Sequence, residues 1–100
     1  MPAPTAAQAI GEVMRASQPL SRLFDRLRES NAMFQAILPL LPQALAASVQ
    51  PGPLDEAGWS LLAANAAVAA KLRQLAPRFE ERLHERGHPV AAIRIKVLPS

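Results

Sequence analysis

The chain has 100 residues, half of them hydrophobic, carries a net charge of +3 and contains no cysteine. This length supports one small domain with a single core, and the hydrophobic content excludes a disordered tail. The lack of cysteine excludes disulfides and thiolate chemistry, and fits a reducing compartment. No apolar run approaches the roughly 20 residues that cross a bilayer, and the N-terminus lacks the pattern of a signal peptide. We therefore expect a soluble cytoplasmic protein that does not contact a membrane.

Nine of the eleven basic residues are arginine. Arginine favours contact with phosphates or carboxylates, because its guanidinium group binds them through two parallel hydrogen bonds. The bias is mild, since many arginine-rich chains reflect a GC-rich genome. Charge alone therefore leaves nucleic-acid contact as the less favoured interpretation.

A short amphipathic helix is expected at residues 5–16, where Thr5 can act as its N-cap. Its apolar positions recur at helical spacing: Ala6, Ile10, Val13 and Met14. The sequence Ser17-Gln18-Pro19 indicates a break and a new helix start, because proline suits the first helical turn. We accordingly assign residues 1–19 to an N-terminal helix and linker, and residues 20–98 to a single folded domain.

The next predicted helix has one apolar face, formed by Leu20, Leu23, Phe24 and Leu27. Its other faces are the most charged part of the chain, which is typical of a solvated helix surface; a basic contact surface is the alternative. Helical periodicity continues from Asn31 to Ala47, but Pro39 and Pro42 each remove a backbone donor. We expect a kink or two short helices there. The apolar run Ala36–Leu45 predicts either burial on several sides or contact with a partner.

A β-hairpin is predicted from the middle of the chain. Val49–Leu54 is interpreted as an edge strand, because its two prolines cannot donate to a ladder. Asp55–Gly58 forms the turn, and Trp59–Ala64 returns as the second strand. Trp59 is interpreted as a core or edge-packing residue, since proteins that stack single-stranded bases place several aromatic side chains on a sheet face.

The longest predicted helix follows, with Asn65 as its cap. Its apolar stripe keeps one phase: Val68, Leu72, Leu75, Phe79 and Leu83. Because this phase passes through Pro77 without a reset, we expect one kinked helix that ends at Gly87. In the third strand, apolar residues from Ala91 to Val97 alternate with polar ones, so one face should pack on the helices and the other should be basic and wet.

The predicted order is helices, strand, strand, helix, strand. The simplest packing is an α+β fold of two layers, with a three-stranded sheet and helices packed on one of its faces.

No catalytic or metal-binding constellation is visible in the sequence. His84 and His88 lie four residues apart, but the helix is expected to end between them and no cysteine or aspartate joins them, so we interpret both as surface residues. Asp55 and Glu56 are interpreted as a solvated turn. Nucleophile motifs and glycine-rich phosphate loops are absent. We expect a binding protein, not an enzyme, without cofactor or metal.

Six short motifs between Phe34 and Val97, in this order, resemble the DciA family, bacterial proteins that assist the replicative DNA helicase. They are FQAIL, VQPGPL, DEAG, WSLLAA, KLRQLAP and IRIKV. The resemblance implies a KH-like fold of the bacterial type and a non-enzymatic adaptor that binds the replicative helicase and assists its loading at replication initiation. The GxxG loop with which KH domains clamp nucleic acid is not matched. Many family members carry a basic tail implicated in DNA contact; since the sequence ends at Ser100, the resemblance implies the helicase-docking part more than the DNA-binding part.

Three hypotheses for the contact surface follow. A helicase-docking adaptor would use Arg73, Arg78 and Arg82 on the long helix, chosen for their expected exposure and not from the family pattern. A nucleic-acid-binding module would use Arg94, Lys96 and neighbouring arginines, and its affinity for DNA would fall steeply with salt. A small homodimer would be joined through the LPLLP face at residues 38–42.

Overall fold

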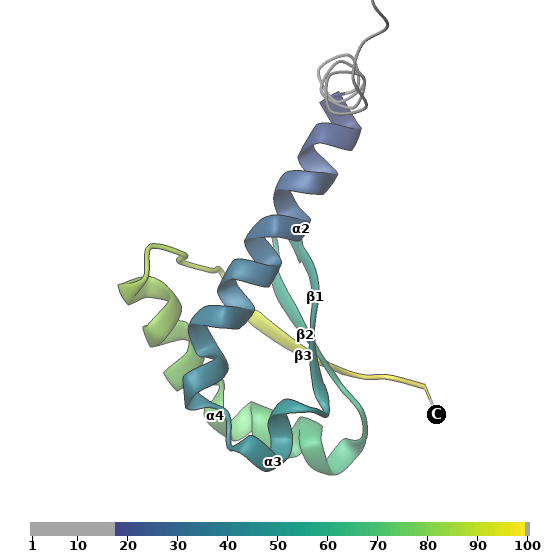
Figure 1. The fold of residues 1–100 in the computed structure, drawn as a ribbon, viewed down its shortest axis with the longest axis vertical. Coiled ribbons are helices and arrows are strands. Elements are labelled where there is room, and N and C mark those ends of the chain that lie inside the picture. Colours follow the sequence, from purple (N-terminus) through teal and green to yellow (C-terminus); the bar gives the residue numbers. More distant parts are fainter. Residues whose placement is uncertain (1–17, 100) are drawn as a thin grey trace, which may run out of the picture.

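The computed structural model describes residues 18–99 and shows a three-stranded sheet packed with helices (Figure 1). Its elements, in chain order, are α2 (Gln18–Ile37), the 3₁₀ helix η1 (Leu38–Leu40), α3 (Gln43–Ala46), β1 (Val49–Asp55), β2 (Gly58–Ala63), α4 (Ala66–Glu85) and β3 (Ile93–Val97). The predicted α+β class and element order are confirmed. The helix expected at residues 5–16 lies outside the described residues.

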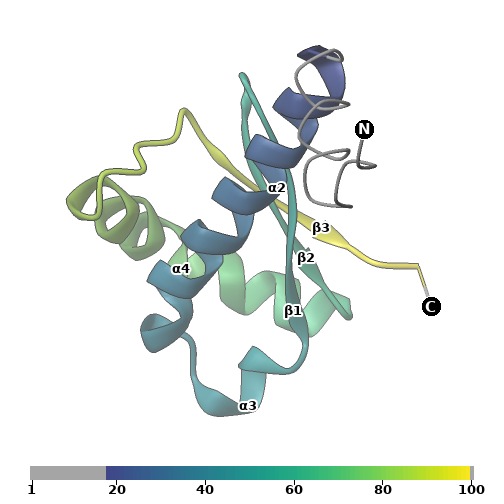
Figure 2. The same ribbon diagram turned by 45° about the horizontal axis from the view of Figure 1, so that its top comes forward.

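The central strand of the sheet is β2. It pairs antiparallel with β1 and parallel with β3, which gives the order β1-β2-β3 and places β1 at an edge, as predicted. The parallel pair requires a crossover connection, and α4 provides it. Trp59, Leu61 and Ala63 alternate along β2, are fully buried and belong to one core cluster with residues of α2 and α4, so both helices cover the same sheet face (Figure 2).

The core draws on every main element. Its fully buried large side chains are Met33 and Ile37 from α2, Trp59 and Leu61 from β2, and Leu72, Phe79 and Leu83 from α4. The expected core role of Trp59 is thereby confirmed. Because the α4 residues fall at steps of four and seven, a single face of one helix supplies its whole contribution.

Ser30 joins α2 to both strands of the hairpin. Its hydroxyl accepts a hydrogen bond from Trp59 Nε1 at 2.9 Å and donates one to the carbonyl of Gly52 at 2.7 Å. Gly52 lies in a β-bulge of β1, where the register with β2 shifts between Pro51 and Leu54. A Cβ atom at Gly52 would stand 2.9 Å from the carbonyl oxygen of Ser60, so only glycine allows this close approach.

The long helix α4 has the boundaries that its sequence predicts. The Asn65 side chain accepts a hydrogen bond from the Val68 amide at 3.0 Å, and Pro77 lies inside the helix without ending it. Gly87 follows the last turn with a φ of 81°. The amide of His88 donates to the carbonyl of Leu83 at 2.7 Å, which completes a Schellman motif.

The two prolines of the Ala36–Leu45 run break the helix into short pieces, as expected. Pro39 falls within η1, and Pro42 is the N-cap of α3. Leu41 is buried, and the other leucines of the run are partly buried against the core. Burial is therefore the role of this run in the fold, and the LPLLP face offers less exposed apolar surface to a homodimer than its sequence suggests.

The sheet face away from the helices is less wet than expected. Arg94 on β3 pairs with Ser60 on β2. Its Nη2 atom donates a hydrogen bond of 2.9 Å to Oδ2 of Asp55, the last residue of β1. The arginine side chain thus spans the sheet, and Ser60 beneath it is fully buried. Lys96 is exposed as predicted, but Arg94 is half-buried with a shielded Nε, so the prediction of a wet basic face is wrong at this position.

The pair also changes the acidity of its carboxylate. The hydrogen bond from Arg94 holds the pKa of Asp55 below its usual value, and the amides of Ala57 and Gly58, which donate to Oδ1, act in the same direction. Asp55 therefore ties the hairpin turn to the far strand more strongly when it is ionised than when it is protonated.

Replacing Ser30 tests the link between α2 and the hairpin. The Ser30→Ala variant leaves the Trp59 indole N–H and the Gly52 carbonyl without their partner, and we expect the free energy of unfolding to fall by about 2–4 kcal/mol. Ser21→Ala, in the same helix, is the control and should change it by less than about 0.5 kcal/mol. Urea titration followed by the fluorescence of the single tryptophan measures both; equal effects of the two variants would contradict the link.

Acid should remove the contribution of Asp55 to the free energy of unfolding. Because the pKa of Asp55 is lower in the folded than in the unfolded chain, its stabilising effect is complete above the unfolded value and is lost as the pH falls from about 5 to below 3. We expect Asp55→Asn to lose less stability than the wild type over this range, measured by urea unfolding at several pH values. Glu56→Gln, which removes a carboxylate from the same turn, should keep the wild-type dependence.

Candidate functional site

The five basic residues predicted to contact a partner lie in three separate places. Arg78 and Arg82 line one hollow on α4. Arg73 is exposed on the same helix but five residues earlier, so it points about 140° away from Arg78. Arg94 and Lys96 lie on the open face of the sheet. The structure therefore brings together one pair on the helix and one pair on the sheet, and leaves Arg73 apart.

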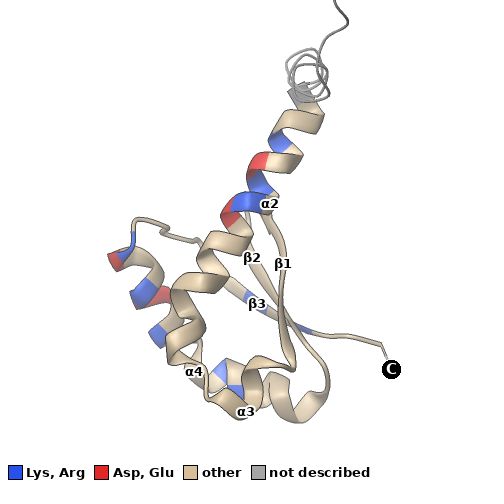
Figure 3. Cartoon of the chain, viewed as in Figure 1, with Lys and Arg blue, Asp and Glu red and all other residues tan. Residues whose placement is uncertain are grey.

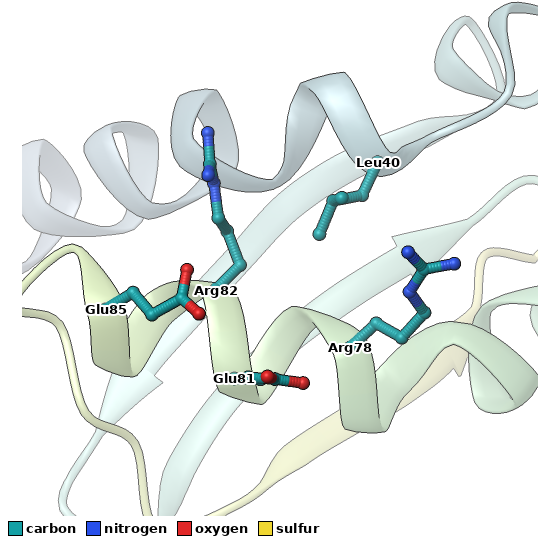
Figure 4. Close-up of a pocket in the computed structure, with 5 residues that line it drawn as sticks. All are labelled: Leu40, Arg78, Glu81, Arg82 and Glu85. Atoms are coloured by element: carbon teal, nitrogen blue, oxygen red, sulfur yellow. The ribbon is translucent and has the colours of Figure 1, made fainter.

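The hollow lies between α4 and η1 and has a volume of about 180 Å³ (Figure 4). It is lined by one apolar side chain from η1 and four charged ones from α4: Leu40, Arg78, Glu81, Arg82 and Glu85. Arg78 and Arg82 are four residues apart, as are Glu81 and Glu85, and Arg78 is three residues from Glu81, so the four charges share one side of the helix. Two arginines and two glutamates leave this surface without a net charge.

Arg82 has a structural role within the hollow. Its Nε donates to the carbonyl of Ala36 at 3.3 Å, and Figure 4 shows its side chain extending from α4 towards α2. This contact satisfies a carbonyl in the last turn of α2. Arg78, in contrast, is exposed and forms no ion pair with any residue in the described range. Of the two arginines, Arg78 is thus the one available to a partner.

The open sheet face offers little to a phosphate. The Nη2 atom of Arg94 is already bonded to Asp55, and that carboxylate offsets its charge. Lys96 remains exposed, beside the half-buried Leu62. A nucleic-acid surface needs several uncompensated cations along the phosphate backbone. Of the two residues predicted for that role, only Lys96 has a charge that no carboxylate in the described range offsets.

A second hollow lies between α2 and β1, and sequence reasoning missed it. It has a volume of about 500 Å³, and its apolar walls include Leu23 and Leu27 from α2 and Pro53 and Leu54 from β1. On the predicted apolar face of this helix, Leu23, Phe24 and Leu27 are 53%, 43% and 51% exposed. In Figure 1 the N-terminal half of α2 extends beyond the strands.

The length of the predicted helix relative to the strand beside it is the sequence signal that could have revealed this exposed apolar face. The 20 residues of α2 span about 30 Å, whereas the seven residues of β1 span only about 23 Å. The charges of this helix gather on the same projecting half, where both signs are present (Figure 3). One end of a helix that outruns its sheet must keep its apolar face uncovered by that sheet.

Other site types are not found between residues 18 and 99. No group of three or more histidine, cysteine, aspartate or glutamate residues could hold a metal ion there. His84 is exposed, and Nδ1 of His88 lies 3.6 Å from a carboxylate oxygen of Glu29 on α2. None of the helices in this range is long and apolar enough to cross a membrane.

Comparison with known proteins adds the family. No curated protein matches the chain. The model of the family described as "Dna[CI] antecedent, DciA" matches residues 5–96, which include all six motifs that carry the resemblance except the last residue of IRIKV. Because the match spans nearly the whole sequence, the chain belongs to the DciA family.

Proposed function

We propose that this protein is a non-enzymatic adaptor that binds the replicative DNA helicase and assists its loading at replication initiation. Membership of the DciA family, through the match over residues 5–96, is the observation that carries the proposal. The observed order of elements, helices followed by strand, strand, helix and strand, is the order predicted from the sequence and agrees with the proposal.

The charge pattern supports a protein partner over a nucleic acid. The hollow on α4 presents two arginines and two glutamates around the apolar side chain of Leu40. A phosphate backbone would be repelled by the two carboxylates, whereas a protein surface can place a cation opposite each glutamate and an anion opposite each arginine. We therefore assign this hollow, with Arg78 as its most available charge, as the helicase contact.

Substituting single arginines on α4 tests this assignment. We expect Arg78→Glu to weaken binding to the cognate helicase by about tenfold, since it places a third negative charge in the hollow. Arg73→Glu makes the same charge change on the same helix, about 140° away, and should leave the affinity within about twofold. Arg82→Glu is unsuitable as a first probe, because it also removes the hydrogen bond to Ala36.

Titration of the purified protein against the helicase, with and without single-stranded DNA, measures these affinities. No association of the wild-type protein at micromolar concentrations would contradict the adaptor function. Wild-type binding that Arg73→Glu and Arg78→Glu weaken equally would instead remove the contact from the hollow. If the protein binds DNA in the absence of helicase, and this affinity falls steeply as the salt concentration rises, the nucleic-acid hypothesis is favoured.

A further inference from the structure

The hollow between α2 and β1 is an apolar groove that the described residues leave open. Leu23 and Leu27 form its wall on α2, and Pro51, Pro53 and Leu54 form its wall on β1. Phe24, on the same half of α2, is also 43% exposed. A helix that presents consecutive large apolar side chains on one face requires a cover in water, because the exposed area costs free energy.

The chain itself supplies a segment of suitable length at this point. The described residues begin at Gln18, so 17 residues precede α2 and join it five residues before Leu23. The helix expected at residues 5–16 would be about 18 Å long, which equals the length of α2 from Gln18 to Glu29. Because α2 already includes Gln18 and Pro19, the two-residue turn of an αα-hairpin would fall at Ala16 and Ser17.

The side chains of this segment match the exposed face of α2. In an antiparallel hairpin that turns at residues 16 and 17, Val13 comes level with Leu20, and Ile10 comes level with Leu23. Glu12, four residues after Gln8, lies with it on the side of the expected helix opposite Ile10 and Val13, and would face water. Apolar side chains would thus meet apolar ones.

Two further observations favour this occupant over a second copy of the chain. A segment attached directly to α2 has an effective concentration in the millimolar range, which a separate molecule at micromolar concentration does not reach. The family match starts at residue 5, so the pattern shared by the family includes the segment together with the folded domain.

We propose that residues 5–16 form a helix that folds back antiparallel on α2 and covers the apolar groove between α2 and β1. The helix completes the apolar core at its open end. The groove is lined by the N-terminal half of α2, whereas the hollow on α4 adjoins its C-terminal end, so the helix leaves Arg78 accessible. The inference does not rest on helicase binding, and its test contains no helicase.

Amide hydrogen exchange of the full chain, resolved by residue, tests the proposal. We expect the amides of residues 8–16 to exchange at least about tenfold more slowly than in an unstructured chain, at any protein concentration. Leu23→Ser combined with Leu27→Ser should return them to within about twofold of the unstructured rate. Val97→Ser is the control, because Val97 is 46% exposed on β3, outside the groove; it should leave the protection unchanged.

A second pair of variants keeps the test valid if the α2 substitutions disturb the domain. Ile10→Ser combined with Val13→Ser should remove the protection of residues 8–16, while the amides of α4 stay protected; Gln8→Ser, on the opposite side of the expected helix, should not. Fast exchange in the wild type overturns the proposal. So does protection that appears only as the protein concentration rises, because a second copy then fills the groove. Protection that survives both double variants overturns it as well.

Discussion

The hydroxyl group of Ser30 makes the contacts on which the arrangement of α2, β1 and β2 depends. It accepts from the indole of Trp59 in the central strand and donates to Gly52 in the bulge of the edge strand. Pro51 and Pro53 cannot donate to the ladder, so this stretch of β1 gains from an anchor outside the sheet. Because Ser30 fixes α2 beyond its midpoint, the turns before it extend past the contact, and the groove beside β1 is a direct consequence.

Those parts of the fold that depend on neighbouring residues could be predicted from the sequence. The unbroken phase of the α4 stripe outweighed Pro77, because the packing of one continuous face offsets the cost of a lost hydrogen bond. Asn65 and Gly87 marked the ends of the helix through cap chemistry that needs only the adjacent residues. The alternation in Trp59–Ala63 likewise places Trp59, Leu61 and Ala63 on one face, and all three are buried in the core.

What could not be predicted depends on residues far apart in the chain. Arg94 and Asp55 are 39 residues apart, and their ion pair exists only because β3 joins β2 in parallel and places Arg94 beside Ser60. Alternation shows which residues of β3 share a face, but not which strand it pairs with. For the same reason the sequence overstated the candidate site. Arg82 and Arg94 are cations by composition, yet their donors are used by the Ala36 carbonyl and by Asp55.

These internal contacts explain why the domain suits a binding role with little rearrangement. Ser30 holds α2 to the sheet. Six residues further along α2, the carbonyl of Ala36 accepts a hydrogen bond from Arg82, which holds the last turn of α2 to α4. Two fixed points about 9 Å apart on one helix keep η1 and α4 in a constant relation, so the hollow between them exists before any partner arrives. A partner that docks there does not lose binding free energy in ordering this surface. In the proposed contact few charges remain for recognition, and their mixed signs would favour a complementary protein surface through matched pairs and not through overall attraction.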